Sequence, residues 1–229
     1  MNVQEMSNYG KSFVDAMTDR ENMKKIEKVM YRELRRELGF IGMLRLWWRM
    51  RNEIKRMKKR DWSKLIKRGL TDQDYLKFVI QSIALVKAMV DIVGMEKAVD
   101  MRHRIWDRTA YTVMTSIFPS VEELKTCEDF FACIREYIKT ANDINKRTGV
   151  YEADIVEDND RVFACNFKYC AYHEVAKEFG DAYLCYPASC YADEVFWSKV
   201  GAEVGWRYQR HGTLATGEQV CDFRLERIS

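Results

Sequence analysis

Apolar side chains recur every three to four positions through the first 150 residues, which is the spacing of an amphipathic helix. Ser120 and Glu123 have the spacing of a capping box, and Gly149 is suited to end the helix that they begin. The pattern therefore predicts a helical part over residues 1–150. Its helices are expected in the ranges 1–60, 71–94, 96–118 and 120–148.

The periodicity then changes from helical to alternating. Residues 152–156 and 161–167 alternate on the two sides of the turn-forming Asp158-Asn159-Asp160. Residues 203–210 and 220–227 alternate in the same way about a turn that contains two glycines. Each pair of segments predicts an antiparallel hairpin.

Two short helices are expected between these hairpins, at 170–179 and 189–200, because Gly180 and Gly201 are suited to end them. The predicted fold class is therefore α+β, with an N-terminal helical bundle packed on a small antiparallel sheet that carries two short helices. Residues 151–229 are expected to form one compact unit with the helical part.

The composition fits a folded protein without export or membrane signals. The 229 residues are 47% hydrophobic, which is enough for a core, and include only two prolines. The longest apolar run, Phe78–Val86, lies between lysines and is too short to span a membrane. No signal peptide is visible at the N-terminus, so the seven cysteines are expected to be reduced thiols in the cytoplasm.

Positive charge is concentrated in the segment 41–70. It contains eleven Lys or Arg but only Glu53 and Asp61 as acids, and Trp47, Trp48 and Trp62 are interleaved with the cations. One interpretation is a surface helix that meets anionic lipid or nucleic acid. The favoured interpretation is an amphipathic helix with solvated cations, because charge runs usually form solvated faces. The net charge of +3 is too small to indicate a nucleic-acid partner, and a homo-oligomer stays open.

The candidate chemistry lies in the last third of the chain. Cys190 and Asp193 are three residues apart on an expected helix and share one face, and Cys170 and His173 have the same spacing on the preceding helix. An imidazole beside a thiol lowers the thiol pKa and makes a usable nucleophile. Such pairs are also common on buried helix faces, so neither is specific alone.

Metal binding is a weaker alternative. Cys165 and Cys170 are spaced C-x4-C, as are Cys185 and Cys190, whereas structural zinc usually has a tighter knuckle. No cofactor is therefore expected, with zinc or an iron–sulfur centre as the less favoured possibility.

Two arginines of the second hairpin are candidates to hold a carboxylate. Arg210 and Arg224 are expected on its two strands, and paired guanidinium groups can bind a carboxylate bidentately. The equally weighted alternative is that Asp222 and Glu226 already pair with them across the sheet.

About the last 70 residues resemble the L-2-amino-thiazoline-4-carboxylic acid hydrolase family. The residues that carry the resemblance are Cys170-Ala171-Tyr172, Gly180, Cys190-x-x-Asp193, Arg210, Thr213-Leu214-Ala215, Gly217 and Cys221-Asp222-Phe223-Arg224. The resemblance implies a hydrolase that opens a cyclic amidine, a five-membered ring with sulfur and nitrogen that bears a carboxylate, on the way to cysteine.

This activity assigns roles to the candidate residues. Either Cys190 or a water activated by Asp193 would attack the amidine carbon, and His173 or Asp193 would move the proton. Arg210 and Arg224 would hold the substrate carboxylate. The remaining predicted site residues are Cys170 as a second candidate catalytic thiol, with Thr213, Tyr172, Cys221 and Asp222 contacting the substrate. The hypothesis requires Cys170, Cys190, Asp193 and Arg224 to converge around one hollow.

The competing hypothesis is a non-enzymatic sensor module. The late glycine and the cysteine in the last strand are also similar to the 4-vinyl-reductase-like small-molecule-binding domains. In that case the cysteines would line a ligand pocket or bind a metal. The helical part would then relay occupancy to a partner.

Overall fold

The computed structural model describes residues 2–16 and 20–228 and confirms the α+β class. The helical part contains η1 (Val3–Glu5), α1 (Phe13–Ala16), α2 (Arg20–Met57), α3 (Ser63–Lys67), α4 (Gln73–Val93), α5 (Met95–Met114), α6 (Val121–Lys125) and α7 (Phe130–Arg147). The α+β part contains β1 (Tyr151–Asp158), β2 (Val162–Cys170), α8 (Ala171–Glu178), η2 (Ala182–Leu184), the π-helical turn η3 (Tyr186–Cys190), α9 (Tyr191–Val204), β3 (Trp206–Gln209), η4 (Leu214–Thr216) and β4 (Cys221–Arg227).

The two expected hairpins join edge to edge into one four-stranded antiparallel sheet. Its strand order is β1-β2-β4-β3, so β2 and β4 are the central pair and hold the two hairpins together. In this pair Cys165 lies opposite Phe223, and Phe163 opposite Leu225. All four side chains are buried on the face that packs against α7 and α9.

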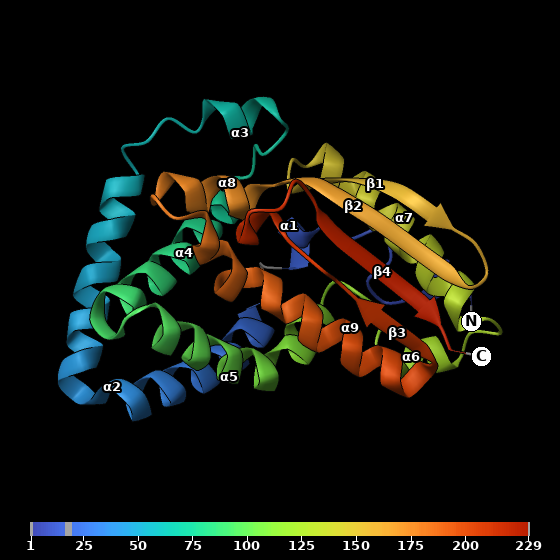
Figure 1. Cartoon of the computed structure of the whole chain (residues 1–229), viewed down its shortest axis with the longest axis horizontal. Coiled ribbons are helices and arrows are strands. Elements are labelled where there is room, and N and C mark those ends of the chain that lie inside the picture. The colour runs from blue at the N-terminus through green and yellow to red at the C-terminus, as the bar shows by residue number, and fades with distance from the viewer. Residues whose placement is uncertain (1, 17–19, 229) are drawn as a thin grey trace.

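The helices α2, α4 and α5 form a second layer beside the sheet (Figure 1). Buried side chains of α2, α4 and α5 pack against one another, among them Leu46, Met89 and Met101. A further cluster joins α4 to α8 and to the start of β1, through residues such as Ile83 and Val175. The α+β part therefore docks on α4 and α5, and the space between the two layers is where a cavity can form.

Helix α2 is bent at Gly39, whose φ of 64° belongs to the left-handed region that glycine adopts readily. Figure 1 shows α2 running along one edge of the molecule and then turning at a corner to continue along the next edge. No helix in the described part of the chain is long and apolar enough to cross a membrane.

Two of the expected helix boundaries are wrong. The capping box of Ser120 and Glu123 is confirmed, with both reciprocal hydrogen bonds, but it begins the short α6, and Asp129 caps a separate α7. Gly201 does not end the helix before it, because α9 continues to Val204. A Cβ at Gly201 would lie 2.4 Å from the carbonyl oxygen of Trp206, so this glycine permits close packing rather than chain reversal.

Candidate active site

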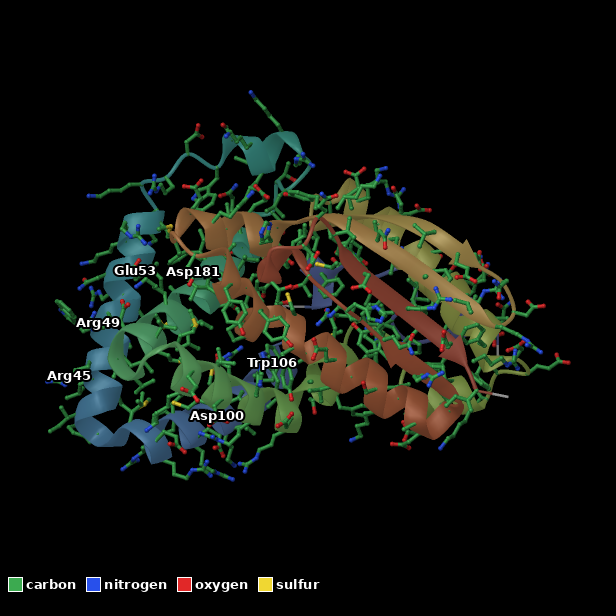
Figure 2. All side chains as sticks on the ribbon, in the orientation of Figure 1. Arg45, Arg49, Glu53, Asp100, Trp106 and Asp181 are labelled. Atoms are coloured by element: carbon green, nitrogen blue, oxygen red, sulfur yellow. The ribbon has the colours of Figure 1, made fainter. Side chains whose placement is uncertain are left out.

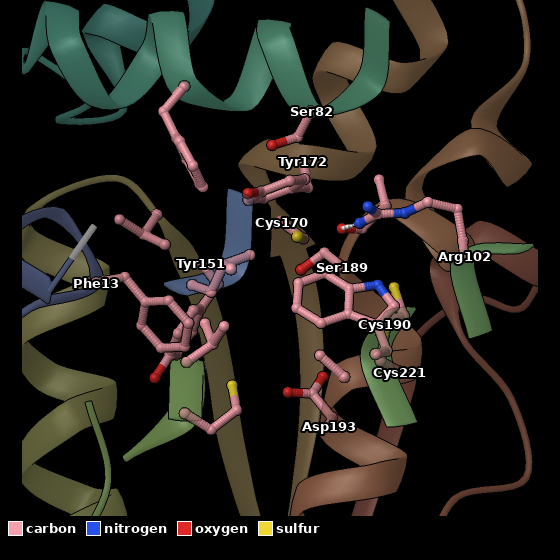
Figure 3. Close-up of a pocket in the computed structure, with 18 of the residues that line it drawn as sticks. Phe13, Ser82, Arg102, Tyr151, Cys170, Tyr172, Ser189, Cys190, Asp193 and Cys221 are labelled. Atoms are coloured by element: carbon pink, nitrogen blue, oxygen red, sulfur yellow. Dashed lines mark hydrogen bonds between the residues drawn. The ribbon is translucent and has the colours of Figure 1, made fainter. Parts of the chain in front are cut away.

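A cavity of about 330 Å³ lies between helices α2, α4 and α5 and the inner face of the sheet. Figure 3 shows how its side chains are arranged. Cys170, Cys190, Cys221 and Asp193 lie on one side, and Phe13 lies on the opposite side. The cavity therefore brings together three thiols and a carboxylate from three separate segments, at Cys170, Cys190–Asp193 and Cys221.

Cys170 is placed by the junction of β2 and α8. It is the N-cap residue of α8, so its sulfur lies at the positive end of the helix, where the first backbone N–H groups lack helical partners. A hydrogen bond from the Cys185 thiol is the largest contribution that lowers the pKa of Cys170. The backbone N–H groups of Tyr172 and His173 lower it further, against the opposing effect of burial. Cys170 is thus the thiol of this cavity that is prepared to ionise.

Cys185 and Cys190 extend this group of sulfurs. The π-helical turn η3 brings their Sγ atoms to 3.6 Å from each other. The hydrogen bonds that Cys185 makes to Cys170 and Cys190 raise the pKa of Cys185 far above its ordinary value. Cys185 therefore stays a thiol, and its single S–H is available to donate to Cys170.

Cys221 faces the cavity from the first residue of β4. Burial raises the pKa of Cys221 to about 12, although the backbone N–H of Leu214 donates to its sulfur at 3.2 Å. Cys221 is therefore a neutral thiol at ordinary pH and a poor candidate for the attacking group.

Asp193 is held by Arg210. The Arg210 Nη1 donates to Asp193 Oδ2 at 3.2 Å, while Nη2 donates to Glu194 Oε1 at 2.8 Å and to the Cys190 carbonyl at 2.6 Å. Burial raises the pKa of Asp193 to about 6, because it outweighs the opposing effect of Arg210. A carboxyl group with this pKa can both donate and accept a proton near neutral pH.

Arg210 is thereby excluded from the role that the sequence suggested for it. Its guanidinium is almost fully buried and already pairs with Asp193 and Glu194. Glu194 also accepts a hydrogen bond from Tyr186 Oη at 2.9 Å. These contacts make Arg210 a positioning group for Asp193 rather than a free carboxylate-binding group.

Arg102 of α5 is the cation that sequence reasoning missed. It is only 5% exposed, and Nε and Nη2 donate to the carbonyl oxygens of Pro187 and Ala188 at 3.1 and 3.2 Å. Its Nη1 has only the Met30 sulfur, at 3.9 Å, and no carboxylate of the described residues pairs with this side chain. Burial lowers the pKa of Arg102 to about 10, so the side chain is still charged near neutral pH.

This arginine therefore presents a buried positive charge with free N–H groups to the cavity. Its guanidinium reaches from α5 toward Cys170 and Tyr172 (Figure 3). A buried cation without an anionic partner is unfavourable in a folded protein, and an anionic ligand would remove that penalty. The sequence did contain a signal: Arg102 interrupts the buried stripe of α5 that includes Ala98, Ile105 and Thr109.

Two tyrosines, the buried Tyr75 and the partly buried Tyr172, add hydroxyl donors to the cavity. The Tyr172 hydroxyl is hydrogen-bonded to the Ser82 side chain, and the Tyr75 hydroxyl has no partner among the described residues. Burial raises the pKa of both phenols, so they stay protonated and can donate hydrogen bonds. Tyr172 and Tyr75 both line the cavity, as the sequence predicted for Tyr172.

His173 and Thr213 do not line the cavity. The His173 ring lies 3.6 Å from Glu174, and burial lowers its pKa. Only the backbone N–H of His173 acts on Cys170. The Thr213 hydroxyl accepts from the backbone N–H of Thr216 and caps η4, so its role is local.

Arg224 and Asp222 also lie away from the cavity, so the expected convergence of four groups is wrong for Arg224. Side chains alternate along a strand, and Cys221 and Phe223 of β4 face the cavity. Asp222 and Arg224 therefore point to the opposite face of the sheet. Arg224 accordingly pairs with Glu157 and with Glu226. Burial opposes ionisation of Asp222, but hydrogen bonds from Gly212 and His211 outweigh it and lower the Asp222 pKa.

The cysteines are divided between the cavity and other parts of the fold. All seven are free, and no set of three or more His, Cys, Asp or Glu side chains within the described residues is arranged to hold a metal ion. Cys165 illustrates why, because it lies in the sheet core, where Asn142 Nδ2 donates to its sulfur at 3.6 Å. Cys170, beyond the register shift of β2 at Lys168, lines the cavity, which Cys165 does not reach.

Comparison with known proteins gives one family match. A family model described as L-2-amino-thiazoline-4-carboxylic acid hydrolase matches residues 73–225. The match begins at α4 and includes Arg102, Cys170 and Asp193, so it extends well beyond the last 70 residues. No curated protein matches the chain.

Among solved structures, the chain is similar to the crystal structure of the phenol-responsive sensory domain of the transcription activator PoxR with phenol. The similarity covers 78% of this chain and 90% of that chain, at 17% identity and a TM-score of 0.43. A likeness at this level says nothing about activity.

Proposed function

The chain belongs to the L-2-amino-thiazoline-4-carboxylic acid hydrolase family, and we propose that it opens a cyclic amidine that bears a carboxylate. The observation that carries this proposal is the pairing of a thiol and a cation in one cavity. Cys170 has a lowered pKa, and Arg102 is buried without an anionic partner. A nucleophile and an anchor for an anionic substrate are therefore present together.

Binding would begin at Arg102. The substrate carboxylate would accept hydrogen bonds from Nη1 and from the second N–H of Nη2, both of which are free of protein oxygen partners. Tyr172 supplies a nearby hydroxyl donor. Fixing the carboxylate in this way would place the ring toward Cys170 (Figure 3).

The first chemical step would be attack by the Cys170 thiolate on the amidine carbon. A bond forms between Sγ and that carbon, the bond between the carbon and the ring sulfur breaks, and the ring sulfur takes a proton from Asp193. Asp193 suits this transfer because its pKa is raised to about 6. The product of this step is an isothiourea in which Cys170 is covalently bound to the substrate.

The second step would be hydrolysis of this intermediate. Water adds to the same carbon and gives a proton to Asp193, and the Cys170 thiolate leaves as a urea group forms. The hydrogen bond from Cys185 and the helix N-terminus stabilise that thiolate as the leaving group. The net reaction adds one water molecule and releases a ureido thiol.

Cys170 replaces Cys190 as the proposed nucleophile. Cys190 lines the cavity, but its sulfur is next to the Cys185 thiol. Although Cys190 immediately precedes α9, the helical turn η3 runs directly into that helix, and the Tyr191 N–H already donates to the Tyr186 carbonyl. Its backbone carbonyl also binds Arg210, which makes its main chain part of the support for Asp193. We therefore assign Cys190 to the cavity wall.

The proposal is tested by incubating the purified protein with 2-amino-thiazoline-4-carboxylate and related cyclic amidine carboxylates. Release of a free thiol is followed by a colorimetric thiol reagent, and the ureido product is identified by mass spectrometry. Cys170→Ser is expected to abolish turnover, whereas the matched Cys127→Ser variant, which changes a thiol outside the cavity, is expected to retain it.

The outcomes separate the enzyme from a ligand-binding module. Turnover by the Cys170→Ser protein at the wild-type rate would reject the covalent mechanism. Binding of these compounds by the wild-type protein without release of any thiol would instead favour the sensor hypothesis.

A further inference from the structure

The cavity is larger than the reacting ring requires. A cavity of about 150 Å³ accommodates a benzene-sized ring, whereas this one measures about 330 Å³. The additional space is bounded by apolar side chains of α2, α4 and α5, including Met30, Met50, Leu85, Ile105 and Val113.

The candidate catalytic groups lie together on one side of the cavity. Figure 3 shows Arg102, Cys170 and Asp193 on one side of the cavity and Phe13 on the other. A ligand that only fills the polar side would leave the apolar side empty, which forfeits the contacts that a well-matched ligand would make there.

We infer that the substrate is an amphiphilic carboxylate: a cyclic amidine that carries an aryl or alkyl substituent. This inference rests on the proposed function. The carboxylate binds Arg102, the amidine carbon lies against Cys170, and the substituent occupies the apolar space bounded by α2, α4 and α5.

Binding of simple n-alkanoates tests this inference without requiring catalysis. Affinities are measured by calorimetry for a series from acetate to octanoate. Burial of each methylene is expected to tighten binding about four-fold, from about 0.8 kcal/mol per buried CH₂, until the cavity is full. A series with no dependence on chain length would overturn the inference.

Two variants locate the site of this binding. Arg102→Met is expected to weaken every member of the series, and Val113→Phe, which adds bulk to the apolar side, is expected to weaken only the longer members. If Val113→Phe lowers the stability of the protein, the chain-length series of the wild-type protein still tests the inference. Equal weakening of short and long members by Val113→Phe would contradict the assignment.

Turnover then separates this inference from the proposed function. If the unsubstituted thiazoline carboxylate is hydrolysed as efficiently as its phenyl-substituted analogue, the inference fails and the proposed function stands. If alkanoates bind with the expected chain-length dependence but no cyclic amidine is opened, the proposed function fails while the amphiphilic site stands.

A second inference comes independently from the outer face of α2. Five large apolar side chains lie exposed just after the bend at Gly39: Phe40, Ile41, Leu44, Trp47 and Trp48, with exposed fractions of 71, 69, 55, 61 and 61%. Their spacing places them on one face of the helix, and Leu46 and Met50 on the other face pack inward. This apolar face is at the corner of the molecule (Figure 1).

The same face continues as a row of cations. At 100° per residue, Arg51 and Lys55 fall on the same arc. Lys58 and Lys59 follow them in the turn that ends the helix. All four are exposed, and within the described chain none has an ion pair. Figure 2 shows the neighbouring Arg45 and Arg49 along the same outer edge; Arg49 pairs with Asp91 and is not counted among the four. The cations therefore remain available to an anionic partner.

We propose that this face of α2 docks on a bilayer that contains anionic lipid. The apolar corner enters the boundary between headgroups and acyl chains, where tryptophan is favoured, and the cations meet lipid phosphates. Nucleic acid would match the cations but would leave Phe40, Ile41 and Leu44 without apolar partners. A second copy paired on this face would bring two rows of cations together.

Co-sedimentation with liposomes tests the docking. The protein is expected to bind vesicles of phosphatidylcholine mixed with phosphatidylglycerol and not vesicles of phosphatidylcholine alone. Lys58→Glu should weaken binding at least about five-fold, from about 1 kcal/mol per lysine near the surface. The matched Lys125→Glu on the distant α6 should leave it unchanged. The paired change of Trp47→Ala and Trp48→Ala should also weaken it.

Several results would overturn the docking proposal. One is equal binding to both kinds of vesicle, and another is binding that Lys58→Glu and the tryptophan changes leave intact. Retention of duplex DNA without retention of vesicles would assign the face to nucleic acid. A dimer that only the tryptophan changes dissociate, again without vesicle binding, would assign it to a second copy of the chain.

Discussion

Replacing Arg102 by methionine tests the central electrostatic feature of the site. Methionine keeps much of the apolar volume of the side chain but removes the positive charge. One N–H of Nη1 and the second N–H of Nη2 have no partner among the described residues, and each would make a charge-assisted hydrogen bond to the substrate carboxylate. At about 1.5–3 kcal/mol for each such bond, the loss is about 3–6 kcal/mol, or about 10²- to 10⁴-fold.

This loss is expected in KM, with kcat little changed. The carboxylate is not part of the bond-breaking chemistry, so Arg102 binds it equally in the ground state and the transition state. Arg102→Lys keeps the charge but loses the planar fork, so its effect should be intermediate.

A substrate without the carboxylate provides the control. Turnover of 2-aminothiazoline, which lacks the carboxylate, should respond little to Arg102→Met, because the contact that is removed does not exist for it. Equal losses on both substrates would refute the reasoning and make Arg102 a structural residue. Steady-state kinetics of the two proteins on the two substrates forms a complete cycle that isolates the interaction.

The stability effect of Arg102→Met must be measured alongside. The Pro187 carbonyl keeps a donor, because Trp106 Nε1 also binds it at 2.9 Å, whereas the Ala188 carbonyl loses its side-chain donor. Leaving that buried carbonyl without its partner costs about 1–3 kcal/mol. Removal of an unpaired buried charge acts in the opposite direction, so thermal unfolding is expected to shift only modestly.

Three further predictions follow from the same geometry. Intact-mass spectrometry during single turnover should detect a covalent adduct that Cys170→Ser abolishes; a persistent adduct in that variant would place the bond elsewhere. The first step needs the Cys170 thiolate together with protonated Asp193. The value of kcat/KM should therefore rise with pH as more thiolate forms. It should level off near the Asp193 pKa of about 6, because above that pH the loss of the Asp193 proton offsets the gain in thiolate. Asp193→Asn should move this inflection up toward the Cys170 pKa, and an unmoved inflection would contradict the assignment. Gly201→Ala should destabilise the protein by about 1–3 kcal/mol, since its Cβ would lie 2.4 Å from Trp206; an unchanged unfolding midpoint would refute this.

The elements of the fold were largely predictable from periodicity. Helical spacing and alternation identify α4, α5, α8 and both hairpins, because each element buries one face and the sequence records which face. The joining of the two hairpins through β2 and β4 was not predictable, since it depends on long-range pairing such as Cys165 with Phe223. The role of Gly201 was misjudged for the same reason. Its small size serves contact with Trp206, and a local pattern does not reveal a neighbour.

The residues of the candidate site were predictable from the sequence only where local sequence signals, such as turns and helix ends, mark their positions. Cys170 and Asp193 are near turns and short helices that the sequence marks, and both face the cavity. The alternation of side chains along β4 could have excluded Arg224 from the cavity, because Cys221 and Phe223 are on the opposite face of the same strand. Arg102 is 68 residues before Cys170 in the sequence, so only the packing of α5 against η3 reveals that the two share a cavity.

The different environments of the two buried arginines explain why only one is suited to bind substrate. Both are almost fully buried, but Arg210 is neutralised by Asp193 and Glu194. Arg102 instead contacts carbonyl oxygens, a sulfur and the face of Trp106, none of which carries a negative charge. Burial without an anion lowers the pKa of Arg102 to about 10, yet the group is still charged near neutral pH. An unpaired buried charge of this kind destabilises the protein without ligand, and an anionic ligand would supply the missing negative charge. The same cavity that weakens the empty fold is thereby selective for a substrate with a carboxylate.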